Sequence, residues 1–160
     1  MTTETFNKAV DTLLDAYNNG TLEHGHCQHC AVGNLLDTGA WAADFMTCFP
    51  RGSNLLIQRN YGSNNRLRKL YKEKGFTRRE LMKIEYAFEY SVSRFEGQPV
   101  DKTTYEFYAK YYKKKGQYIG LCAVIDVMSK MVNDSVQSPV ESKQRLTKIA
   151  NEKYGVLVEM

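Results

Sequence analysis

The segment Thr77–Val92 constrains the fold most strongly, because it marks both the start and the buried side of one long helix. Thr77 can accept a hydrogen bond from the amide of Glu80, and the Glu80 side chain can reach back to the Thr77 amide, which is the capping-box pattern. The apolar residues that follow recur at the spacing of one helix face: Leu81, Ile84, Phe88 and Val92. A helix with one apolar side requires other elements to cover it.

Apolar residues at helical spacing recur through the rest of the chain. They predict further helices near residues 6–17, 30–36, 40–49, 65–74, 104–115, 118–132 and 139–154. Gly20 and Gly116 are read as the C-terminal signals of two of them. No run alternates as a strand does, and no fixed internal period suggests a repeat protein. The sequence predicts one all-α domain over residues 1–160, a bundle of six to eight helices.

The length of 160 residues suits a single hydrophobic core that needs no disulfide or metal for stability. No apolar run approaches the roughly 18 residues that span a bilayer, and the polar start of the chain does not resemble a signal peptide. We therefore expect a cytoplasmic protein without a membrane partner. The four cysteines are too few and too unevenly spaced for a disulfide scaffold, and we expect thiols.

The stretch His24–Cys30 holds all three histidines and two of the four cysteines. Cys27 and Cys30 have the spacing at which two thiolates can bind one tetrahedral zinc ion. The remaining ligands of a structural zinc could come from His24, His26 or His29, or from Cys48 or Cys122 if the fold brings one close. No second pair of ligands follows at a recognisable distance, so a plain loop with partly buried cysteines is the competing interpretation.

The same two cysteines allow a thiol-redox interpretation. Cys27 would lie just before a helix, where the helix dipole and the histidines favour the reactive thiolate. Around Glu23 and Cys27-x-x-Cys30 the sequence resembles the all-α alkylhydroperoxidase D-like family over about a dozen residues. In that family a histidine follows the second cysteine by four residues, whereas this chain has Asn34 there. The departure puts a proton relay of that kind in doubt.

Basic side chains concentrate in residues 59–79, where only Glu73 opposes them. The candidates for contacts to nucleic-acid phosphates are Arg66, Arg68, Lys69, Lys72, Lys74, Arg78 and Arg79. Tyr61 and Tyr71 lie nearby and could stack on bases. A solvated helix surface explains the same charges without any ligand. The tyrosine-rich helix expected at 104–115 is ambiguous in the same way, since it could belong to the core or to an interface.

Assembled catalytic groups are not recognisable in the sequence. It contains no Gly-x-Ser-x-Gly elbow, no Walker loop and no Gly-x-Gly-x-x-Gly motif. The Asp and Glu side chains fall on helix faces that the pattern predicts to be solvated. We therefore predict no catalytic residue, and the sequence favours a protein that is not an enzyme.

Two phrases carry a second resemblance, Cys30-Ala-Val-Gly-Asn-Leu-Leu36 and Gly120-Leu-Cys-Ala-Val-Ile-Asp-Val-Met128. They resemble small hypothetical proteins of gut Bacteroidales and their phages or mobile elements. The resemblance implies an accessory protein and brings no activity, ligand or catalytic residue.

The leading interpretation of the sequence is a non-enzymatic helical interaction module with a His/Cys loop that could hold a structural zinc. The alternative is a nucleic-acid-binding regulator that uses residues 59–79, and the third is a thiol-redox protein that uses Cys27 and Cys30. The sequence identifies neither a protein partner nor an oligomeric state.

Overall fold

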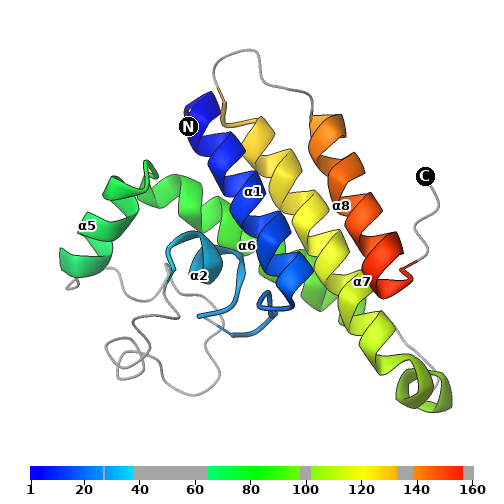
Figure 1. Ribbon diagram of the computed structural model, residues 1–160. Coiled ribbons are helices and arrows are strands. Elements are labelled where there is room, and N and C mark those ends of the chain that lie inside the picture. Colours follow the sequence, from blue (N-terminus) through cyan, green and yellow to red (C-terminus); the bar gives the residue numbers. More distant parts are fainter. Residues whose placement is uncertain (27, 38–64, 98–101, 133–138, 157–160) are drawn as a thin grey trace.

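A computed structural model describes residues 1–26, 28–37, 65–97, 102–132 and 139–156 (Figure 1), with the side chains of 65–67, 102–111 and 139 excepted. These residues form helices and connecting turns, and no strand occurs among them. The helices are α1 (Thr3–Asn19), α2 (Ala31–Leu35), α5 (Asn65–Glu73), α6 (Arg78–Glu96), α7 (Lys102–Ser129) and α8 (Pro139–Tyr154). The predicted all-α fold is confirmed, while the helix expected at 40–49 lies outside the described residues.

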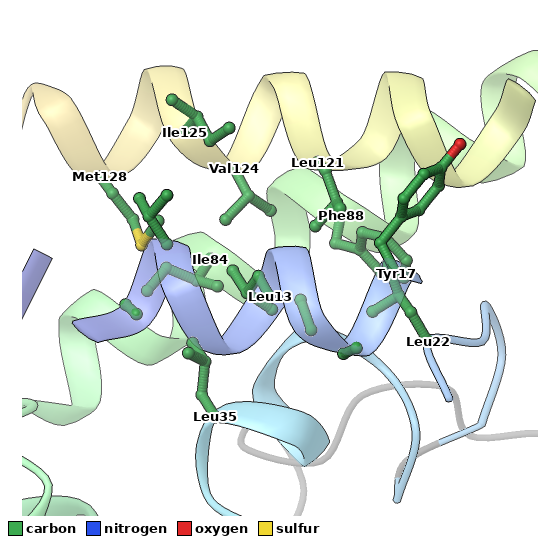
Figure 2. Packing of buried hydrophobic residues seen from close by; sticks show 14 of the residues in the cluster. Leu13, Tyr17, Leu22, Leu35, Ile84, Phe88, Leu121, Val124, Ile125 and Met128 are labelled. Atoms are coloured by element: carbon green, nitrogen blue, oxygen red, sulfur yellow. The ribbon is translucent and has the colours of Figure 1, made fainter. Parts of the chain in front are cut away.

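The helices pack as a bundle around one core. Helices α1, α7 and α8 lie side by side, and α6 crosses behind α1 and packs along α7 (Figure 1). Figure 2 shows Leu13 of α1, Phe88 of α6 and Leu121 of α7 meeting between the helices. Each of these three side chains is at most 2% exposed. The buried apolar sides of α1, α6 and α7 therefore hold the bundle together.

Local sequence signals fix the ends of α1 and α6. Thr2 caps α1 by accepting from the amide of Thr5, and Gly20 ends it in the left-handed conformation at φ 77°. At α6 the Thr77 hydroxyl accepts from the Glu80 amide, and Oε2 of Glu80 accepts from the Thr77 amide at 2.7 Å. The predicted end of α1 at Gly20 and the predicted start of α6 at Thr77 are both confirmed.

The prediction that Gly116 ends a helix is wrong, because α7 runs through it without a break. A Cβ atom at Gly116 would lie 3.2 Å from the Phe95 ring, and one at Gly120 would lie 2.6 Å from Val92 and 2.8 Å from Phe88. The two glycines lie four residues apart on one side of α7, so they leave room for α6 to approach closely. Packing, rather than termination, explains their place in the sequence.

Candidate functional site

The His/Cys loop, residues 21–30, leads from the end of α1 to the start of α2. It closes on itself through backbone hydrogen bonds, from Glu23 N to His29 O at 2.7 Å and from Cys30 N to His26 O at 2.7 Å. The Asn34 amide of α2 donates to the carbonyl oxygens of His29 and Cys30 at 2.7 and 3.0 Å. Asn34 therefore holds the loop together at the position where the alkylhydroperoxidase D-like pattern has a histidine.

The candidate zinc ligands of this loop have different surroundings. Cys30 is fully buried, and its Sγ caps α2 by accepting from the Gly33 amide at 3.3 Å. His26 and His29 lie together, with ring centroids 5.2 Å apart. Cys27 lies outside the described residues. Within the described ranges, no group of three or more His, Cys, Asp and Glu side chains could hold a metal ion.

His24 of the candidate set contacts side chains of α6. Its Nδ1 lies 3.0 Å from Glu96 Oε2, and its Nε2 lies 3.2 Å from Glu89 Oε2. The hydrogen-bond partner of Nε2 is the Ser93 hydroxyl at 2.9 Å, so one ring nitrogen meets a carboxylate and the other meets a hydroxyl group beside a second carboxylate. The amide of Gly25 also donates to Glu89, at 3.1 Å. The loop is therefore fastened to α6 through acidic side chains.

Two of the glutamates on α6 are buried, contrary to the prediction that the acidic side chains are solvated. Glu85 is 2% exposed and Glu89 is 5% exposed. Burial is the largest effect on Glu89 and raises its pKa to about 7. The charges of Glu85 and Glu96 raise the pKa further, and the bond from Gly25 opposes them. Helical spacing places Glu85 and Glu89 beside the buried residues Leu81 and Phe88. The sequence interpretation missed their burial because charged side chains are expected to be exposed.

Gln117 of α7 fastens the start of the same loop. Its amide is buried, 1% exposed, and donates to the carbonyl oxygen of Leu22 at 2.7 Å. Leu22 is itself fully buried, so this hydrogen bond satisfies a carbonyl group that water does not reach. The residue was missed because its partner lies 95 positions away in the sequence.

The predicted phosphate-contacting residues divide between two helices. Arg68, Lys69 and Lys72 are exposed on α5, and Lys69 lies 3.9 Å from Glu73 of the same helix. Arg66 belongs to α5, but its side chain lies outside the described residues. At the start of α6, Arg79 is exposed and Arg78 is half-buried. Lys74, just after α5, is exposed as well, so the structure places five described cations of the set on accessible surface.

The exposed side of α6 carries an arrangement that the sequence interpretation did not identify. Arg79, Lys83, Tyr86, Tyr90 and Arg94 follow one another at intervals of three or four residues, so they share one face of the helix, and all five are exposed. We call these five residues the basic-aromatic stripe. It contains no acidic residue, since Glu85 and Glu89 lie on the buried side of α6.

The two tyrosines at the centre of the stripe stack on each other. Their ring centroids are 5.4 Å apart and their planes differ by 10°. Tyr86 is 58% exposed and Tyr90 is 50% exposed. The sequence did contain a signal for them, because both positions are out of phase with the buried residues Leu81, Ile84, Phe88 and Val92.

The chain finds no match among family models, curated proteins or solved structures. In the part of the chain that the structure describes, no helix is both long enough and apolar enough to cross a membrane.

Proposed function

We propose that this chain is a non-enzymatic helical interaction module that binds nucleic acid through the exposed side of α6. The observation that carries the proposal is the basic-aromatic stripe, in which three cations flank two exposed aromatic rings. Arginine and lysine contact phosphates, and tyrosine can stack on bases, so one face of one helix offers both kinds of contact. The exposed cations of α5 extend the set by Arg68, Lys69 and Lys72.

Charge distribution supports an anionic partner. Arg79 and Lys83 have no acidic partner among the described residues, and the acidic side chains Glu85, Glu89 and Glu96 serve the core and the His/Cys loop instead. Cations without a local counter-charge retain their full attraction for phosphate. Binding to nucleic acid would release counterions and would weaken as salt is added.

The test measures binding of fluorescent single-stranded and duplex oligonucleotides by anisotropy between about 50 and 200 mM salt. Arg79→Gln/Lys83→Gln removes two cations of the stripe. Lys148→Gln/Lys153→Gln removes two exposed cations of α8 and is the matched control, since the net charge changes equally. We expect the stripe variant to bind more weakly and to reduce the slope of log K against log salt by about 1.5, from about 0.7–0.9 per lost phosphate contact.

Failure of the wild-type protein to bind either oligonucleotide at low salt would reject the proposed function. So would an equal loss of binding in the control variant, because non-specific charge would then explain the result.

The structural zinc predicted for the His/Cys loop belongs to this proposal as a separate element. The neighbouring rings of His26 and His29, on either side of Cys27 in the sequence, support it. Imidazole nitrogens and thiolates are common ligands of structural zinc. The zinc would stabilise the loop, with no part in contacting nucleic acid.

A further inference from the structure

We infer that the ligand of the basic-aromatic stripe is single-stranded nucleic acid, with unpaired bases stacking on Tyr86 and Tyr90. The inference rests on the proposed function and deepens it by naming the form of nucleic acid that the site selects.

Tyr86 and Tyr90 form a stacked pair on the exposed side of α6. The rings are nearly parallel, and each is half or more exposed. Each ring has one face toward its neighbour, and we assign the opposite face of each ring as the one on which a further planar group stacks. A base that stacks on such a face would extend the existing pair in the same direction. Base–aromatic stacking of this kind tolerates any sequence, because every base has a π-face.

The faces of the bases are accessible in a single strand but not in a duplex. In a duplex, each base is already stacked on both sides and paired along its edge, so a side-chain ring reaches its face only after unstacking. Recognition of duplex DNA by a helix instead uses polar side chains that read base edges in the major groove. At the centre of the stripe stand two aromatic rings, which suit the unpaired bases of a single strand.

The cations of the stripe lie on both sides of the tyrosine pair along α6. Lys83 precedes Tyr86 by three residues and Arg94 follows Tyr90 by four, which separates each cation from a ring by about 5 Å along the helix axis. Flexible arginine and lysine side chains can therefore reach the phosphates that adjoin a stacked base. From Arg79 to Arg94 the stripe extends about 22 Å, enough for a short run of nucleotides.

The experiment compares an oligothymidine of about 15 nucleotides with a duplex of the same length. Tyr86→Leu/Tyr90→Leu removes the aromatic faces and keeps exposed helix-forming residues and every cation. Tyr86→Phe/Tyr90→Phe keeps the rings and is the control. We expect the wild-type protein and the Phe variant to bind the single strand at least about tenfold more tightly than the duplex. The Leu variant should lose about tenfold or more of single-strand affinity and little of duplex affinity.

A second readout does not depend on affinity. An oligonucleotide with bromouracil crosslinks under ultraviolet light to aromatic residues that it stacks on, and we expect the crosslink at Tyr86 or Tyr90. This readout uses the wild-type protein, so it decides the question even if the Leu variant fails to fold.

The outcomes separate the inference from the proposed function. Equal affinity for single strand and duplex, with the Leu variant unaffected, would overturn the inference and leave nucleic-acid binding in place. No binding to either form would overturn both. Tighter binding of a polyglutamate peptide than of either oligonucleotide would assign the stripe to an acidic protein segment and would also overturn both.

Discussion

The Nε2 atom of His24 lies 3.2 Å from Oε2 of Glu89, a buried carboxyl whose pKa is raised to about 7. In the unfolded chain this carboxyl would titrate near 4.5. The folded state therefore holds the proton more tightly, and its stability is greatest below the unfolded value and falls as the pH rises from about 4.5 to about 7. Burial of Glu89 thus makes the fold pH-sensitive in a range where most carboxyl groups no longer titrate.

Glu89→Gln should remove this sensitivity, because the amide carries no charge and its oxygen can still accept from Gly25. We expect the variant to be more stable than the wild-type protein above pH 7, by an amount that approaches about 3 kcal/mol for a shift of this size. Denaturant unfolding at several pH values between 4.5 and 8 measures the difference. Parallel pH profiles for the two proteins would contradict the prediction.

The close contact of α6 and α7 predicts that Gly120→Ala is destabilising, although alanine is ordinarily the better helix former. The new Cβ would lie 2.6 Å from Val92 and 2.8 Å from Phe88, so the helices must separate, at a cost of about 1–3 kcal/mol. Gly116→Ala, at 3.2 Å from Phe95, should cost less. Thermal unfolding orders the two variants, and Phe88→Leu should restore part of the stability lost in Gly120→Ala. Equal stability of Gly120→Ala and wild type would show that the contact can relax.

Gln117→Leu should destabilise the protein by about 1–2 kcal/mol, because it leaves the buried carbonyl oxygen of Leu22 without its donor. Gln144→Leu, at an exposed position of α8, is the matched control and should change stability by less than about 0.5 kcal/mol. Denaturant midpoints report both. An equal effect of the two substitutions would mean that the hydrogen bond to Leu22 does not matter for the fold.

The Thr77 cap predicts a small, specific loss. Thr77→Ala should lower the free energy of unfolding by about 1 kcal/mol, since the amide of Glu80 loses its acceptor, and Thr77→Ser should restore it. Urea denaturation of the three proteins tests the order. If alanine and serine behave alike, the hydroxyl group does not act as a cap.

The zinc proposal predicts about one zinc ion per chain, lost together with thermal stability in Cys27→Ser. Cys30→Ser gives a sharper comparison, because the serine hydroxyl can still accept from the Gly33 amide and keep the cap of α2. The substitution then removes only the thiolate that would bind zinc. Elemental analysis and thermal unfolding of the three purified proteins provide the readout. If the wild-type protein contains no metal and both variants melt at the same temperature as the wild type, the two cysteines do not bind a structural zinc ion.

Local signals predicted the parts of the fold that depend on neighbouring residues. The Thr77 capping box and the left-handed Gly20 are set within a few positions, so the starts and ends of α6 and α1 could be read directly. The role of Gly116 could not be read from its neighbours in sequence, because this glycine makes room for α6, some twenty residues away in the chain. A glycine in a sequence has the same appearance whether it ends a helix or admits a neighbour.

The candidate site was predicted only in part for the same reason. The sequence identified the histidines and cysteines of the loop but not that His24 would reach Glu89 and Glu96, 65 and 72 residues downstream. The cations Arg78 and Arg79 were identified by local charge density, whereas Tyr86 and Tyr90 needed the phase of α6 to be compared with its buried residues. The zinc ligands, the nucleic-acid contacts and the resemblance to Bacteroidales proteins stay predictions.

Helix α6 separates its charges across its width, with cations on the exposed side and carboxyl groups under the His/Cys loop. At a pH above about 7, where Glu89 is ionised, this arrangement adds a transverse electrical polarity to the net charge of +4. An approaching polyanion would exert a torque that turns this side toward it before any contact forms. Orientation during diffusion, as well as the contacts made afterwards, would then decide how fast the protein finds its partner.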